Sequence, residues 1–141
     1  MRNKTSSFFS LIVTTILASS LASAQVSIVT TIRPLQLIAE SIVGESDTVT
    51  SIVGRQDSPH QFVLTPSDRL AIASADLLIW TGPELEVYLE GFFNNESRSG
   101  SIITVLENPI LTIHKINDEI DAHFWLNPDN GIALADEIKD R

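Results

Sequence analysis

The sequence predicts an α/β fold: a four-stranded parallel sheet with helices on both of its faces. Two observations carry this prediction. Short runs rich in branched apolar residues alternate with segments whose apolar residues recur at helical spacing. One run, residues 76–80 (DLLIW), is apolar after its first residue, as is typical of parallel strands buried on both faces. Strands that alternate with helices form right-handed β-α-β units, so the strands are expected to lie parallel.

The first half of the chain predicts strand, helix, strand. Residues 26–32 are rich in β-branched residues and predict the first strand, and residues 47–53 predict the second. Between them a helix is expected to begin at Pro34 and to end at Gly44, because proline suits the first helical turn and glycine the carboxyl end.

The second half repeats the alternation. A helix should begin at Pro66, with Thr65 as its N-cap and Asp68 in its first turn. After the strand at residues 76–80, an amphipathic helix is predicted over residues 84–93. The remaining expected elements are a fourth strand at residues 101–106, a less regular segment, and a final helix that begins at Pro128 and runs to the end of the chain.

Residues 1–24 are predicted to be a cleavable secretory signal peptide. Arg2 and Lys4 provide its positive start, residues 8–17 its apolar middle, and Ala22 and Ala24 its small-residue cleavage positions. The apolar run is shorter than the roughly 18 residues that a membrane-spanning helix needs. The chain contains no cysteine, so no lipid can be attached to one. We therefore expect a released, periplasmic protein.

Composition narrows the function classes. Without the predicted signal peptide, the chain has 7 basic and 18 acidic residues, a formal charge of −11. Such a charge argues against nucleic acid as a partner and is compatible with attraction of cations. The absence of cysteine excludes disulfides, thiolate metal ligands and a nucleophilic thiol.

Three histidines, His60, His114 and His123, are the only nitrogen or sulfur side chains suited to a metal such as zinc. His60 lies between Pro59 and a capped helix, so its loop has little freedom, and His123 lies two residues after Asp121, a potential hydrogen-bond partner. Both follow predicted strands and should reach the same edge of the sheet. Taken alone, a loop histidine is more often exposed or locally hydrogen-bonded than a metal ligand. His114 lacks these features and is predicted to be structural or exposed.

Other notable side chains have ordinary explanations. Glu84 and Glu86 would occupy the first turn of the helix at residues 84–93, where the helix dipole favours acids regardless of function. Trp80 and Trp125 are expected in the core. Asp57 is best explained as a turn residue before Ser58, although it could also support His60.

Four segments in order resemble one family. They are TIRPLQLIAESIVG, DSPHQFVLTPSD, ADLLIWTGPELE and DAHFWLNP. The chain is similar to the N-terminal lobe of the zinc- and manganese-specific solute-binding proteins of ABC importers, often called cluster A-I. The resemblance implies that His60 and His123 are metal ligands and that further ligands come from a second lobe absent from this sequence. It also implies a lobe over residues 25–127 and, from residue 128 to residue 141, the start of the helix that connects the two lobes.

The resemblance implies a periplasmic binding protein, and no enzyme, that captures a divalent ion and delivers it to a permease in the inner membrane. Zinc is the expected cargo, since two nitrogen ligands suit zinc better than manganese, and the protein is expected to be a monomer. A manganese-binding member and a metal-dependent adhesin are the alternatives. A metallohydrolase is the weaker alternative, because no motif supplies a general base.

Overall fold

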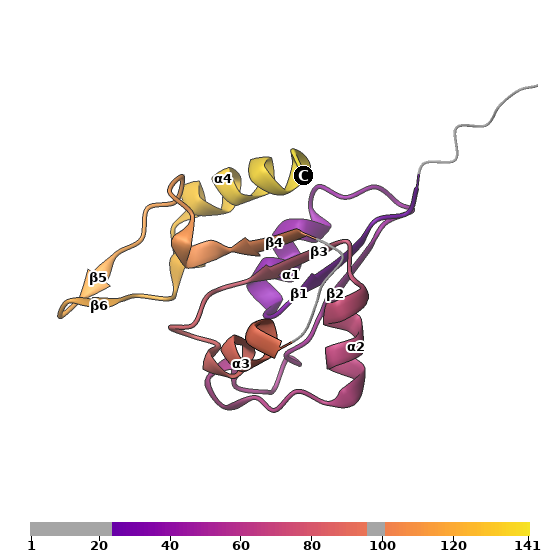
Figure 1. The fold of residues 1–141 in the computed structure, drawn as a ribbon. Helices are drawn as coiled ribbons and strands as arrows, with labels where there is room; N and C mark the ends of the chain where they lie inside the picture. The colour runs from indigo at the N-terminus through magenta and orange to yellow at the C-terminus, as the bar shows by residue number, and fades with distance from the viewer. Residues whose placement is uncertain (1–23, 96–100) are drawn as a thin grey trace, which may run out of the picture.

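The computed structural model describes residues 24–95 and 101–141 and confirms the predicted fold class. Four strands form one parallel sheet in the order β2-β1-β3-β4 (Figure 1). The strands are β1 (Ser27–Thr30), β2 (Thr48–Ser51), β3 (Leu77–Trp80) and β4 (Ser101–Thr104). Each is shorter than its predicted run, and β2 and β4 form the two outer edges. The predicted signal peptide lies almost wholly outside the described residues.

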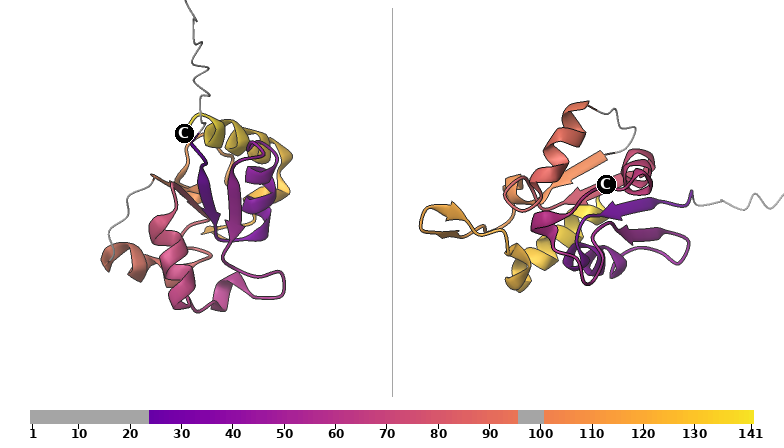
Figure 2. Two further views of the ribbon diagram at one scale, coloured as in Figure 1. Left: turned by 90° about the vertical axis from the view of Figure 1, so that its right-hand side faces the viewer. Right: turned by 90° about the horizontal axis from the view of Figure 1, so that it is seen from below.

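Helices cover both faces of the sheet, as predicted (Figures 1 and 2). One face carries α1 (Arg33–Glu40) and α4 (Pro128–Lys139), and the other carries α2 (Pro66–Ser74) and α3 (Val87–Asn95). The connection from β1 to β2 therefore crosses one face, while the connection from β3 to β4 crosses the other. The sheet reverses its direction of winding between β1 and β3, the point at which ligands bind in open α/β sheets.

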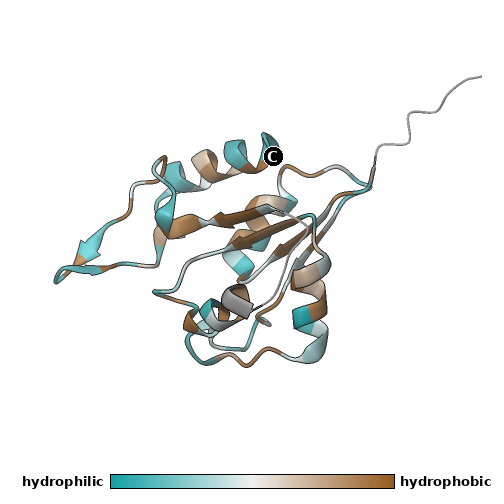
Figure 3. Cartoon of the chain, in the orientation of Figure 1, coloured by the Kyte–Doolittle hydropathy of each residue, from teal (hydrophilic) through white to brown (hydrophobic). Residues whose placement is uncertain are grey.

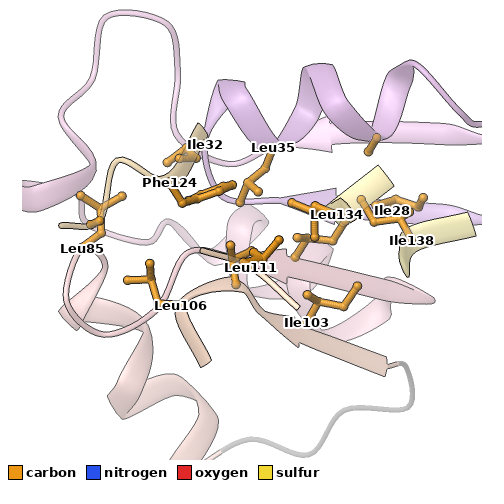
Figure 4. Packing of buried hydrophobic residues seen from close by; sticks show 14 of the residues in the cluster. Ile28, Ile32, Leu35, Leu85, Ile103, Leu106, Leu111, Phe124, Leu134 and Ile138 are labelled. Atoms are coloured by element: carbon orange, nitrogen blue, oxygen red, sulfur yellow. The ribbon is translucent and has the colours of Figure 1, made fainter. Parts of the chain in front are cut away.

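Two hydrophobic cores form because successive side chains of a strand point to opposite faces. In β1, Ile28 joins the core under α1 and α4, whereas Val29 joins the core under α2 and α3. In β3, Leu78 is 0% exposed against α2 and α3, and Ile79 is 0% exposed against the other pair. Figure 3 shows β3 and β4 as largely hydrophobic, and Figure 4 shows the first core closely packed.

The final helix belongs to the first of these cores. Leu134 and Ile138 of α4 pack in the same cluster as Leu35 and Ala39 of α1 (Figure 4). Pro128 is its first residue, as predicted, and the Asn127 side chain accepts a hydrogen bond from Asp129 N at 3.1 Å. Its predicted role as the start of a connection between two lobes stays a prediction.

The prediction for α2 is confirmed at its cap. The Thr65 hydroxyl accepts from Asp68 N at 3.3 Å, and the Asp68 carboxylate accepts from Thr65 N at 2.8 Å. This reciprocal capping box satisfies two backbone donors that the helix leaves open. The helix start therefore gives the preceding loop, with His60, a fixed end.

The prediction for α3 was wrong at its start. The helix begins at Val87, not at residue 84, because the preceding residues form a tight turn in which Leu85 N and Glu86 N donate to Gly82 O. Glu86 is not an exposed first-turn acid. It is 0% exposed, and its carboxylate accepts from Thr81 N at 2.7 Å.

A small hairpin was not predicted. Strands β5 (Lys115–Ile116) and β6 (Glu119–Ile120) pair antiparallel between β4 and α4. Asn117 and Asp118 have φ values of 53° and 67°, as in the two-residue turns that match strand twist. Three short 3-10 helices complete the described chain: η1 (Pro59–Gln61), η2 (Val105–Glu107) and η3 (Phe124–Leu126). None of the helices within residues 24–95 and 101–141 has the length and apolar character needed to span a bilayer.

Candidate metal centre

His123 precedes η3 and is held by Asp121. The Asp121 carboxylate lies 2.8 Å from His123 Nδ1 and also accepts from His123 N at 3.0 Å. The His123 ring meets the edge of the Trp125 ring, with centroids 5.2 Å apart. These contacts fix the imidazole, and its side chain stays 51% exposed.

The Asp121 contact also prepares the ring chemically. A neutral imidazole carries one N–H, and a carboxylate at Nδ1 selects the form that donates from Nδ1. Nε2 is then left with a free lone pair, as in carboxylate–histidine–metal arrangements. Hydrogen bonds from the His123 backbone and ring lower the pKa of Asp121, so this carboxyl is ionised at neutral pH.

His114, predicted to be structural or exposed, lines the same pocket as His123. The pocket has a volume of about 170 Å³ and is also lined by Asp121 and Asn130. Asp121 N donates to His114 O at 2.9 Å, which extends the hairpin ladder and brings these two residues opposite each other. His114 is exposed, in line with the prediction, but its place opposite Asp121 was not predicted because the hairpin was missed. The Asn-Asp pair at positions 117 and 118, between two apolar-containing dipeptides, was the available signal.

His60 lies outside this pocket, in a segment that also begins at the carboxyl end of a strand. It occupies η1, is exposed, and does not line the His123 pocket. The segment with His60 follows β2 and the segment with His123 follows β4. These are the two outer strands, and the three interstrand spacings between them amount to about 14 Å. Both segments thus begin at the carboxyl ends of parallel strands, as predicted. The convergence of the two rings on one ion stays a prediction.

The donor set within the described residues is small. Three exposed imidazoles, those of His60, His114 and His123, and the Asp121 carboxylate are available, and no cluster of three or more histidine, cysteine or acidic side chains in this part of the chain has the geometry to hold an ion. Structural zinc sites are usually four-coordinate. Two histidines from this lobe would therefore leave at least two positions for ligands from outside it.

A different polar group, Glu86, lies at the carboxyl ends of the central strands. It follows β3 and reaches back to Thr81 N, 2.7 Å from its carboxylate. Burial raises the pKa of Glu86 to about 7, and the hydrogen bond from Thr81 opposes this rise. Burial and the nearby Glu86 and Asp68 carboxyls raise the pKa of Tyr88. Glu86 is fully buried and is not available to an ion from solvent.

These features define an open α/β lobe with histidines displayed on loops at the carboxyl ends of its strands. Comparisons with known proteins agree. The sequence model of the family described as ZnuA, zinc-uptake complex component A, periplasmic, matches residues 28–141. The chain belongs to this family of metal-binding solute-binding proteins.

Individual relatives carry different metals in their names. The chain is 31% identical over 137 residues to the iron-binding protein YfeA of Yersinia pestis, covering 94% of this chain and 44% of YfeA. It is 31% identical over 115 residues to the manganese-binding lipoprotein MntA of Halalkalibacterium halodurans, covering 80% of this chain and 37% of MntA.

The fold is similar to that of the Zn(II)-bound ZnuA-like domain of Streptococcus pneumoniae AdcA. The TM-score is 0.69 at 22% identity, over 82% of this chain and 43% of that domain. This likeness concerns the fold. The chain spans less than half the length of these relatives.

Proposed function

We propose that this chain forms the metal-capturing N-terminal lobe of a periplasmic solute-binding protein, and that its cargo is a divalent ion, zinc first. His60 and His123 are its two ligands, and the ABC permease in the inner membrane is its recipient. The protein is exported with residues 1–24 as a cleavable signal, acts as a monomer and makes or breaks no bond.

One observation carries this proposal: the Asp121 carboxylate lies 2.8 Å from His123 Nδ1. It leaves the Nε2 lone pair free on a half-exposed ring, which suits a ligand and serves no core packing. The place of the ring in the fold supports the same conclusion. The sheet reverses its winding between β1 and β3, and the outer strands on either side lead to the segments with His60 and His123.

Manganese is the second candidate, and one finding favours it. A relative that matches 80% of this chain is named for manganese. The donor chemistry favours zinc, because imidazole is a good zinc ligand and manganese prefers oxygen donors. A competition experiment decides which ion the chain binds more tightly. Zinc and manganese are each titrated against a chromophoric chelator in the presence of the chain.

Three alanine substitutions test the ligand assignment. Zinc binding by the full chain, measured by competition with a chromophoric chelator, should be largely lost in His60→Ala and in His123→Ala. His114→Ala is the matched control and should retain the parent affinity. Equal and undiminished binding in all three variants would contradict the proposal. Loss in His114→Ala and His123→Ala, with His60→Ala unaffected, would move the site to the pocket that the first two share.

A further inference from the structure

Asn130 is a buried amide in the first turn of α4. It is 2% exposed, although asparagine is a poor helix former and a buried amide is costly unless it is hydrogen-bonded. Its partners all lie outside the helix. Nδ2 donates to Thr112 O at 2.9 Å and to Phe124 O at 3.0 Å, and Oδ1 accepts from Thr112 N at 2.8 Å.

These three hydrogen bonds hold both ends of the segment from Thr112 to Phe124, which contains the β5-β6 hairpin. Thr112 begins the segment that leads into the β5-β6 hairpin, and Phe124 begins η3 where that segment returns. His114, Asp121 and His123 lie between these two ends. The Asn130 amide is therefore the polar link from α4 to the base of the segment that contains His123.

The bonding pattern requires an amide in one orientation. Two carbonyl oxygens face the NH₂ group, and one backbone N–H faces the oxygen. A carboxylate of the same shape would keep the bond from Thr112 N but would set an oxygen against the Thr112 and Phe124 carbonyls. The position thus distinguishes asparagine from aspartate, although the two are nearly identical in size.

We propose that Asn130 is a positioning residue for the His123 ligand. By holding Phe124 O, its amide fixes the backbone directly after His123, and by holding Thr112 it fixes the opposite side of the segment. Asp121 then orients the ring on a backbone that is already in place. The inference rests on the proposed function, since it assigns Asn130 to the same site.

Asn130→Asp tests this role in the full chain, with Zn²⁺ as the probe. Zinc affinity should fall about 10- to 100-fold, the usual cost of losing a group that holds a metal ligand in place. Asn108→Asp is the matched control. Asn108 also bonds to α4, through Glu137, but at the other end of that helix. It should alter zinc affinity less than about twofold, because none of the hydrogen bonds of Asn108 to the described residues reaches η3.

A double-mutant cycle separates positioning from general loss of structure. If Asn130 acts through His123, the Asn130→Asp change should have almost no further effect on zinc affinity in a His123→Ala background. The same loss in both backgrounds, or no loss in the parent background, overturns the inference. If Asn130→Asp fails to fold, Asn130→Ser, which adds no repulsion, takes its place.

A second readout needs no metal. Nitrogen-15 NMR of the His123 ring in the metal-free chain should show a single form protonated at Nδ1, and Asn130→Asp should convert it to a mixture of both neutral forms. An unchanged ring spectrum contradicts the inference. Undiminished zinc binding by His123→Ala would instead contradict the proposed function. The NMR result would still decide whether Asn130 positions the His123 ring.

Discussion

One carboxylate oxygen of Asp121 contacts two atoms of His123, the backbone N and the ring Nδ1. This carboxylate accepts from the backbone N–H and lies beside ring Nδ1, so Asp121 sets both the position and the protonated nitrogen of the imidazole. His60 has no such support. Its side chain makes no hydrogen bond, ion pair or ring contact with the described residues, and its rigidity comes from Pro59 and from the cap of α2.

We predict that Asp121→Asn weakens zinc binding about 10- to 100-fold, because the amide cannot select the Nδ1–H form as a carboxylate does. Chelator competition at neutral pH measures the loss. Asp118→Asn is the control, since it removes the same charge from the nearby hairpin turn, where asparagine also tolerates a positive φ. Equal losses in the two variants would mean that only the net charge matters.

Glu86 makes the stability of the fold depend on pH. Burial raises its pKa from 4.5 to about 7 in the folded chain. Between these values the folded state binds more protons than the unfolded state, so the free energy of unfolding falls as pH rises and levels off above about pH 7. The opposite direction would apply to an acid whose pKa is lowered by folding.

Glu86→Gln should remove this dependence, because the amide oxygen can still accept from Thr81 N and carries no charge. Relative to the variant, the parent chain should lose on the order of 3 kcal/mol of unfolding free energy between pH 4.5 and pH 7.5. Urea denaturation of both proteins across this range provides the measurement. If the difference in unfolding free energy between the two proteins stayed constant from pH 4.5 to pH 7.5, the pKa of Glu86 would not be raised by folding.

Among the elements, α4 matters most to the site because it supplies the anchor for the His123 segment. Its packing is testable separately. Leu134→Ala should cost about 2–5 kcal/mol of unfolding free energy, because Leu134 is 0% exposed in the first core. Ile132→Ala, at a position on the same helix that is 64% exposed, should change stability by no more than about 0.5 kcal/mol. Equal, small effects in a urea titration would mean that α4 does not pack on this lobe.

The elements also show what could be predicted from sequence. The central strands β1 and β3 were predictable because they are buried on both faces, which leaves apolar runs. The outer strands β2 and β4 are more exposed and were predictable from their β-branched residues. The start of α2 was predictable because Thr65, Pro66 and Asp68 form a local cap signal. The hairpin was not, since two-residue strands that are largely exposed leave no apolar pattern. His114 is exposed, in line with its prediction, but for that reason its place in the pocket with His123 could not be predicted.

Glu86 and Asn130 illustrate a different limit. Each is a polar residue that is buried because it has hydrogen-bond partners outside its own helix. Glu86 accepts from Thr81 N, and Asn130 bonds to the backbones of Thr112 and Phe124. Local rules placed Glu86 in the first turn of a helix, where the dipole favours an acid. Only the tertiary arrangement shows that these side chains point inward, whereas the hydrogen-bond partner of His123, two residues away, was within reach of sequence reasoning.

At the scale of the whole molecule, the parallel order β2-β1-β3-β4 directs the segments with His60 and His123 to one side of the sheet from its two outer strands. Their rings must approach across the ends of the central strands to share an ion. If the two rings bind one ion as proposed, both would approach it from the same end of the sheet, and the other coordination positions would stay open to ligands from elsewhere.

The most direct test of this account is a crystal structure of the chain grown with zinc, with the ion located by anomalous scattering at the zinc edge. We predict one ion with a ring nitrogen of His60 and Nε2 of His123 each about 2.0–2.1 Å away. An ion held by His114 and His123, with the His60 ring remote from it, would contradict the central claim.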